Sequence, residues 1–395
     1  MTTTARVKVA VTAAGFTSFA LLYAPQAVLP QLAQQYHLDP GGASLAVSVA
    51  TGALAISVLP IAALSEVVGR RAVILTSVIV SAVLGLLLPL MPSYSLMLVL
   101  RAVQGVAIAG FPGVATAYLV ERLGKVGVAA AVGAMIAGNS IGGMTGRLAT
   151  GFTAAPFGWR GALYVVAGLS LVCAIVTVVT LPPSHRAPDE PRQHVRDVCV
   201  GVLHAVRKPV LLAQYAVALL AMGSFVALYN AAGFRLTGEL HLSEALASLV
   251  FLAYALGSVS SALASRLSAR IGRRRAILGA LLTMAVGGVL TIPDSVLLFA
   301  LGFVVLTCSF FAAHAIANSW AAAEAPEHAR GQTGGLYTLL YYLGSSIGGA
   351  VGAVIYGTAG WAWLIVAVAV WLALAAVAVG VGTAVRVRPR ELAHS

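Results

Sequence analysis

The sequence predicts an all-α integral membrane protein with twelve transmembrane helices in two six-helix, pseudo-symmetric halves. Three observations lead to this prediction: the composition, the number of apolar segments and an internal duplication. Of 395 residues, 60% are hydrophobic and only 9% are charged, and the mean hydropathy is +0.95. So few charges cannot solvate a water-soluble domain of this size. The chain is therefore expected to lie in a lipid bilayer.

Twelve apolar segments have the length of roughly 20 residues that a bilayer-spanning helix needs. The first follows Arg6 and Lys8 and is too long for a signal peptide, so we interpret it as a membrane helix. The predicted spans cover about 9–32, 44–65, 72–91, 95–119, 127–150, 161–181, 210–233, 245–265, 276–293, 295–320, 332–356 and 362–384.

The only long polar loop, residues 182–209, contains five prolines and divides the chain near its middle. We predict an N-terminal half at 1–181, a cytoplasmic linker at 182–209 and a C-terminal half at 210–395, which ends in a short cytoplasmic tail. All but four of the 24 Lys and Arg residues fall on the side of this linker and of both termini. The positive-inside rule then makes that side cytoplasmic. The basic charge is thus a topology signal and not a nucleic-acid patch.

A duplicated glycine pattern links the two halves. Six of nine positions agree between Gly138-Asn-Ser-Ile-Gly-Gly-Met-Thr-Gly146 and Gly344-Ser-Ser-Ile-Gly-Gly-Ala-Val-Gly352. Glycine at every fourth position gives one helix face without side chains, against which a second helix can pack at backbone distance. The predicted packing residues are Gly138, Gly142, Gly146, Gly344, Gly348 and Gly352.

Motifs in several spans resemble those of the major facilitator superfamily. Glu66-Val-Val-Gly69-Arg70-Arg71 looks like the signature between the second and third helices, and Arg270-Ile-Gly272-Arg273-Arg274 resembles its second-half copy. Leu100-Arg101-Ala-Val-Gln104-Gly105 is similar to the motif of the fourth helix, and the first glycine stretch resembles a fifth-helix motif associated with exporters. The resemblance runs from about residue 10 to 385 and implies two parallel six-helix repeats with a site between them.

Two further stretches narrow the resemblance. Tyr23-Ala-Pro25-Gln26 and Tyr341-Tyr-Leu-Gly344 look like the YnfM-type, arabinose-efflux-permease-like branch of the drug:proton antiporters. The resemblance therefore implies antiport, efflux and multidrug resistance, although such branches handle unrelated substrates. It also implies that the first, fourth, seventh and tenth helices line the cavity, with the fifth and eleventh beside them.

The family's charge relay at the inner gate is altered in this chain. Glu66 stands where the family has Asp, and Val67 stands where an Arg is usual, so Arg70 or Arg122 would have to complete the relay. Alternatively, the Gly-Arg-Arg motif only enforces topology. The predicted gating and coupling residues are Glu66, Gly69, Arg70, Arg71, Glu121, Arg122, Arg270, Gly272, Arg273 and Arg274.

The predicted cavity is neutral to positive. All twelve acidic residues can be placed outside the deep membrane, where Arg101, Arg147 and His314 are the ionisable groups. This disfavours permanently cationic substrates, which need a counter-charge in a desolvated site. Arg147 either acts in the cavity or snorkels to the interface. Predicted substrate contacts are Gln26, Arg101, Gln104, Asn139, Tyr229, Asn230, His314, Asn318, Tyr337 and Tyr341.

These features favour a proton-coupled exporter of a small amphipathic, neutral or anionic compound. A sugar or metabolite facilitator and a lipid flippase remain as alternatives on the same fold. An enzyme is disfavoured because the spans hold no nucleophile, metal cluster or paired acids. We expect no cofactor, no metal and no nucleic-acid partner. The predicted partners are a small-molecule substrate, protons and the lipid of the cytoplasmic membrane, with the chain acting as a monomer.

Overall fold

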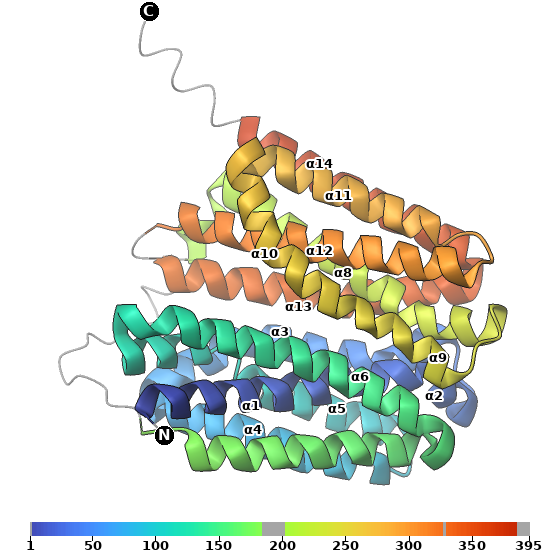
Figure 1. Cartoon of the computed structure of the whole chain (residues 1–395), viewed down its shortest axis with the longest axis horizontal. Coiled ribbons are helices and arrows are strands. Elements are labelled where there is room, and N and C mark those ends of the chain that lie inside the picture. Colours follow the sequence, from blue (N-terminus) through green and yellow to red (C-terminus); the bar gives the residue numbers. More distant parts are fainter. Residues whose placement is uncertain (1, 184–201, 327–328, 385–395) are drawn as a thin grey trace, which may run out of the picture. The chain divides into compact units, whose positions relative to one another are not determined.

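Every regular element in the computed structural model, which describes residues 2–183, 202–326 and 329–384, is a helix (Figure 1). The first half contains α1 (Thr3–Tyr23), α2 (Leu29–Tyr36), α3 (Pro40–Val68), α4 (Arg70–Leu87), α5 (Tyr94–Ala109) and α6 (Ala115–Thr180). The second half contains α8 (Pro209–Phe234), α9 (Glu244–Ser248), α10 (Ala253–Ile271), α11 (Arg273–Leu290), α12 (Val296–Glu324), α13 (Arg330–Ala359) and α14 (Trp361–Ala384). Most of the predicted linker and the predicted cytoplasmic tail lie outside the described residues.

The helices account for the twelve predicted spans. Within the described residues, nine helical stretches are long and apolar enough to cross a membrane. One of them, Gly127–Thr180, holds two spans, because the chain at Gly158 leaves the helical conformation with φ 65°. The short apolar helix α5 and the start of α6 together form the fourth span. α11, whose first three residues are arginines, forms the ninth span.

Proline sets the end of the first helix. The predicted first span, about 9–32, is divided into α1, a 3₁₀ turn at Ala24–Val28 and α2. Pro25 lies in this turn and has no N–H for the carbonyl of Leu21, four residues earlier. The carbonyl groups at the end of α1 are therefore available to donors from other helices.

The described chain groups into two compact units. The first comprises Met1–Arg192 together with Gly233–Leu252, and the second comprises Gln193–Ala232 with Ala253–Ser395. In the first unit α1 packs on α6 and α4, and α3 packs on α5. In the second unit α12 packs on α10, α11 and α13, while α14 packs on α11 and α13. The segment Gly233–Leu252 follows α8 in sequence but packs within the first unit.

Both units contain a tightly packed glycine face. In the first, Gly138, Gly142 and Gly146 of α6 lie against Thr12, Phe16 and Ala20 of α1. In the second, Gly344, Gly348 and Gly352 of α13 lie against Leu219, Gly223 and Ala227 of α8. A Cβ atom at any of these six glycines would lie less than 3.0 Å from its neighbour. Backbone contact of this kind allows close helix association where lipid supplies no hydrophobic driving force.

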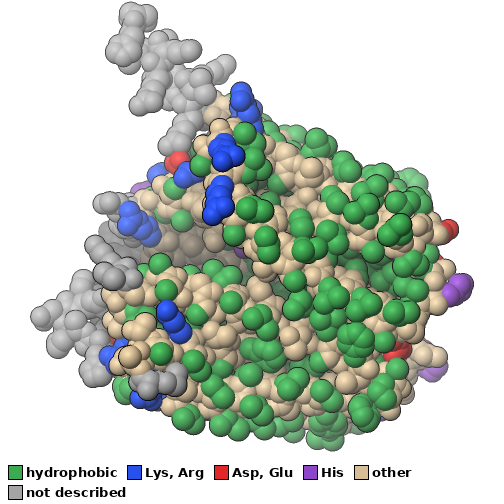
Figure 2. Space-filling model, viewed as in Figure 1, with side chains coloured by type: hydrophobic (Ala, Val, Ile, Leu, Met, Phe, Trp, Pro, Cys, Tyr) green, Lys and Arg blue, Asp and Glu red, His purple; other side chains and the backbone are tan. Residues whose placement is uncertain are grey.

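The surface has the polarity of a membrane protein. Hydrophobic side chains cover the middle of the visible face, and the visible charged side chains lie towards the ends of the helices (Figure 2). Exposed Val, Leu and Ile residues occur along most of the long helices, among them Val172, Val259 and Val377. Such continuous apolar exposure is unfavourable in water but suits contact with lipid tails.

Candidate functional site

The turn between α3 and α4 carries a three-residue ion network. Arg70 donates to Glu66 at 2.7 Å and to Glu121 of α6 at 2.9 Å. Gly69 makes the turn possible with φ 102°, a backbone conformation that side chains disfavour. Arg71 donates to the carbonyl of Leu181 at 3.1 Å. The predicted relay residues on this side therefore lie together, with Arg70 at their centre.

The corresponding turn in the second half repeats the glycine but not the network. Gly272 has φ 86°, so the sharp turn between α10 and α11 is the same. Arg270, Arg273 and Arg274 are exposed, and none takes part in an ion pair within the described residues. Arg122 is half-buried beside the first network. Only the first of the two predicted gate regions thus shows paired charges in the described chain.

Arg101 of α5 is fully buried and holds three helices together. Its guanidinium donates to the carbonyls of Leu21 (3.0 Å) and Leu22 (2.6 Å) at the end of α1. It also donates to the carbonyl of Ala46 in α3 at 2.6 Å and to Oε1 of Gln104 at 2.6 Å. One of these carbonyls is the one that Pro25 leaves without a helical donor.

This arrangement differs from a side chain that points into an open cavity. Arg101 and Gln104 are both 0% exposed, and Gln104 in turn donates to the carbonyl of Ser81 at 3.1 Å. A buried guanidinium is tolerated because most of its N–H groups have acceptors. In this conformation Arg101 stabilises the bend of α1, and its contact with substrate stays a prediction.

Arg147 of α6 is the second buried cation of the first unit. It does not snorkel, because it is only 1% exposed. Its Nε donates to Oε1 of Gln26 at 2.5 Å and its Nη1 to the carbonyl of Gly143 at 2.8 Å. The guanidinium also lies 4.2 Å from the ring centre of Tyr23 and 5.4 Å from that of Phe251. Cation–π contacts of this kind stabilise a desolvated guanidinium.

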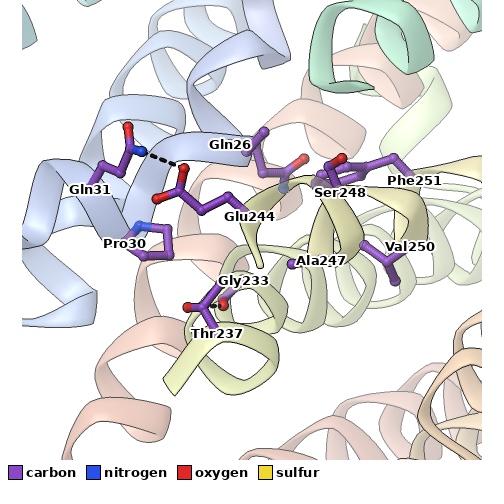
Figure 3. Close-up of a pocket in the computed structure, with 11 residues that line it drawn as sticks. Gln26, Pro30, Gln31, Gly233, Thr237, Glu244, Ala247, Ser248, Val250 and Phe251 are labelled. Carbon is purple, nitrogen blue, oxygen red and sulfur yellow. Dashed lines mark hydrogen bonds between the residues drawn. The ribbon is translucent and has the colours of Figure 1, made fainter. Parts of the chain in front are cut away.

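A small pocket lies beside this cluster, between α2 and the segment that contains α9 (Figure 3). Across it, Nε2 of Gln31 donates to Oε2 of Glu244 at 2.5 Å. The polar lining groups are amides, hydroxyls and one carboxylate. The lining residues are Gln26, Ala27, Pro30, Gln31, Gly233, Thr237, Glu244, Ala247, Ser248, Val250 and Phe251.

The sequence analysis missed most of this pocket. Gln26 was predicted to contact substrate, but Gln31, Glu244 and Phe251 were not considered. An ion pair at 2.9 Å between the buried Arg235 and the exposed Glu239 lies in the same segment and was also missed. The available signal was Arg235 itself, one of the four basic residues outside the cytoplasmic set. An unmatched cation with an acid four residues later indicates an ion pair on one helical turn.

The second unit brings together aromatic and neutral polar side chains. Tyr337 of α13 hydrogen-bonds to Nδ1 of His314 at 3.0 Å, and the ring of Tyr341 lies 4.7 Å from the imidazole. Phe310 stacks on His314 at 6.0 Å. His314 and Tyr341 are half-buried, so part of this cluster is accessible. Three of the predicted contact residues therefore form one cluster.

The remaining predicted contacts are more scattered. Tyr229 of α8 hydrogen-bonds to Thr307 of α12 at 2.8 Å and is buried among Phe225, Tyr254 and Phe303. Asn230 is buried, and Asn318 is exposed one turn beyond His314. In the first unit the half-buried Asn139 contacts α1 at Gly15. The structure therefore divides the predicted residues into a set in each unit.

An all-helical bundle with an apolar surface, a duplicated glycine face and small polar clusters inside is the architecture of a membrane transporter. The family model of the Major Facilitator Superfamily matches residues 11–237 and 216–394. The chain therefore belongs to the Major Facilitator Superfamily, and it is a secondary transporter and not an enzyme. The predicted all-α, twelve-helix fold is confirmed.

Two relatives match most of the chain. The inner membrane transport protein YnfM of Escherichia coli (strain K12) is 36% identical over 90% of this chain and 85% of its own length. The uncharacterized MFS-type transporter YybF of Bacillus subtilis (strain 168) is 33% identical over 89% of this chain and 86% of its own length. The predicted resemblance to the YnfM branch is thus confirmed as homology, without showing the drug:proton antiport.

Solved structures support the fold. The bacterial homologue of the human lysosomal transporter Spinster, in its inward-facing and occupied conformation, has a TM-score of 0.80 over 95% of this chain and 96% of its own. The D323A mutant of the nucleoside transporter NupG has a TM-score of 0.76 over 95% of this chain and 99% of its own. Their sequence identities of 15% and 14% limit the comparison to the fold.

Proposed function

We propose that the protein exports a small amphipathic, neutral or anionic compound across the cytoplasmic membrane in exchange for protons, by alternating access. In this proposal both termini are cytoplasmic and the chain works as a monomer. The distribution of the basic residues supports the orientation. Homology to a protein described as an inner membrane transport protein supports the location.

The observation that carries the substrate class is the sign of the buried charge. Arg101, Arg147 and Arg235 are buried, whereas no Asp or Glu in the described ranges is buried except for the side chain of Glu121, which already pairs with Arg70 beside the turn between α3 and α4. A permanently cationic substrate would have to leave water for an environment that lacks a buried counter-ion. A neutral or anionic compound avoids that cost, and an anion would gain from the positive field of the buried guanidinium groups.

The cluster around His314 supports a substrate with an apolar ring. Half-buried His314 and Tyr341 offer ring faces and hydrogen-bonding atoms without a fixed charge. Binding sites for small molecules combine this type of apolar wall with a few orienting polar groups. The tenth and eleventh helices, which carry these residues, are among those that the family resemblance places at the cavity.

Reconstituted vesicles test the proposal. The purified protein is placed in proteoliposomes with an imposed pH gradient, and fluxes of an anionic, a neutral and a quaternary ammonium dye of similar size are compared. We expect the pH gradient to drive transport of the neutral or the anionic dye, and we expect no transport of the quaternary ammonium dye. Transport of the cation alone would contradict the charge argument. Flux that ignores the pH gradient would make the protein a facilitator.

A further inference from the structure

The hydrogen bonds of Tyr337 determine which nitrogen of His314 carries a proton. The Tyr337 hydroxyl lies 3.0 Å from Nδ1 of His314 and 3.3 Å from the backbone carbonyl oxygen of the same residue. A tyrosine hydroxyl has one proton to donate, and a carbonyl oxygen can only accept. The two contacts cannot both receive that proton.

Only one arrangement satisfies both contacts. If the hydroxyl donates to the carbonyl, Nδ1 must carry a hydrogen and donate it to the hydroxyl oxygen. If the hydroxyl instead donates to Nδ1, the carbonyl oxygen faces only a lone pair of the hydroxyl oxygen and receives no hydrogen bond from it. The neutral imidazole is therefore held with its hydrogen on Nδ1, which leaves Nε2 as an acceptor.

The surroundings leave Nε2 as the reactive end of the ring. No hydrogen bond within the described residues uses Nε2, and the His314 side chain is half-buried. The ring of Phe310 lies nearly parallel to the imidazole at 6.0 Å, and Tyr341 lies beside it at 4.7 Å. Asn318, one turn further along α12, is exposed. Nε2 of His314 thus lies in an aromatic setting with a neutral amide one turn away.

No charged group from the neighbouring helices contacts this ring in the described residues. The titratable groups that face it are the hydroxyls of Tyr337 and Tyr341, both from α13. From α10 and α11, which also pack on α12, the charged residues are exposed arginines at 266, 270 and 273–275. α8, which contacts α12 through Tyr229 and Phe225, contains no charged residue. A proton on Nε2 would therefore be the only charge that this cluster can acquire.

We infer that Tyr337 is a positioning residue, which keeps Nε2 of His314 available as a hydrogen-bond acceptor. The substrate is then a neutral, ring-bearing compound whose hydroxyl or N–H group donates to this atom. The inference rests on the proposed function and narrows its substrate class. A proton on Nε2 turns the acceptor into a donor, so proton and substrate compete for one atom. Competition for one site is the linkage that antiport requires. An anionic substrate would instead bind more tightly once His314 is protonated and positively charged. Proton and substrate would then bind together, as in co-transport.

Binding of two matched probes tests this inference on the full-length protein in nanodiscs. The probes are naphthol and its methyl ether, which share a ring system but differ in the hydrogen-bond donor. At about pH 8 we expect naphthol to bind about two- to tenfold more tightly, the range of one hydrogen bond. This preference should weaken progressively as the pH is lowered, because a protonated Nε2 no longer accepts a hydrogen bond.

Tyr337→Phe should reduce the preference by half or more and alter its pH dependence, since the hydrogen of His314 can then occupy either nitrogen. Tyr215→Phe is the matched control. It also removes a tyrosine hydroxyl that donates to a carbonyl of α13, that of Thr333, at 3.4 Å. This control should retain the wild-type preference. Nitrogen-15 spectra of a variant with His314 as its only histidine should show the hydrogen on Nδ1.

Three results would overturn the inference: equal or undetectable binding of the two probes, a wild-type pH profile in Tyr337→Phe, or a hydrogen on Nε2 in the spectra. The proposed function is judged separately by flux under a pH gradient. A protein that prefers naphthol but ignores the gradient would retain the inference and lose proton-coupled export.

Discussion

The two units share a packing device but bury different chemistry. In each, a row of three glycines brings one helix to backbone distance from another, α6 on α1 and α13 on α8. The three arginines that are buried in the described part of the chain, Arg101, Arg147 and Arg235, belong to the first unit. The second unit instead contains a continuous cluster of aromatic rings, from Phe225 to Tyr341. The two units thus share the glycine-mediated helix packing but differ in the side chains that they bury.

The difference has a physical cause. A buried guanidinium needs several acceptors, and in the first unit the bend at Pro25 provides a carbonyl without a helical donor. The second unit contains aromatic side chains, which pack without charge and need only a few hydrogen bonds. We infer that the first unit supplies a rigid, positively charged scaffold and the second an adaptable neutral surface.

The largest effect is expected from filling the glycine faces. Gly142→Leu and Gly348→Leu each place a side chain where backbone atoms of the facing helix lie. The helices would have to separate, and we expect little folded protein from either variant. Yield of monodisperse protein after detergent extraction measures this effect, and transport by the remaining fraction measures its functional cost.

Glycines that face open space provide the controls. A Cβ at Gly168 in the first unit or at Gly279 in the second meets no atom within 4 Å. Gly168→Leu and Gly279→Leu should therefore give yields close to wild type. If Gly142→Leu and Gly348→Leu match these controls, the shared scaffold is not needed for folding.

A smaller loss is expected when Arg101 is changed. Arg101→Ala leaves buried carbonyls of α1 and α3 without a donor, and hydrogen bonds of charged groups contribute about 1.5–3 kcal/mol each. We expect a lower thermal unfolding midpoint, on the order of 5 °C or more. Arg101→Lys should recover less than half of this loss, because an ammonium group cannot reproduce the fork of the guanidinium. A wild-type midpoint in both variants would contradict the role of Arg101 at the α1 bend.

Much of the fold could be predicted from the sequence, because bilayer thickness and hydrophobicity fix the length and number of the spans. The glycine repeats also indicated which helices carry close-packed faces. The break of the first span was not predicted, although Pro25 and Pro30 were visible in it. Proline is common in membrane helices, and its presence alone does not tell a kink from a helix end.

The site was harder to predict because it depends on which helix faces meet. The acid that faces Gln31 is Glu244, and one of the two rings that face Arg147 is Phe251, both distant in sequence. Neither pairing repeats between the halves, so the duplication gives no clue to them. His314 was recognised because it is a predicted deep side chain that can titrate near neutral pH, and Tyr341 because it lies four residues after Tyr337 on the same helix face.

A moderate effect should distinguish the two acids that bind Arg70. The side chain of Glu121 is 8% exposed and that of Glu66 is 38% exposed, so water screens the second pair more strongly. Glu121→Gln should therefore weaken the network more than Glu66→Gln, with a cost of about 1 kcal/mol or more against a few tenths. Denaturant or thermal unfolding and transport rate measure the two effects. The reverse order would show that Glu66 is the principal partner of Arg70.

The smallest effect concerns the neutral hydrogen bond between Tyr229 and Thr307, which joins α8 to α12 in the second unit. Tyr229→Phe leaves the buried Thr307 hydroxyl without this partner, and Thr307→Val does the same to the tyrosine. Each single variant should lose about 1 kcal/mol of unfolding free energy. The double variant removes both polar atoms and should lose less than the sum of the two single losses. A double-mutant cycle on thermal or denaturant unfolding measures this coupling. Strictly additive losses would mean that the hydrogen bond contributes nothing, and that the aromatic packing alone holds this part of the second unit together.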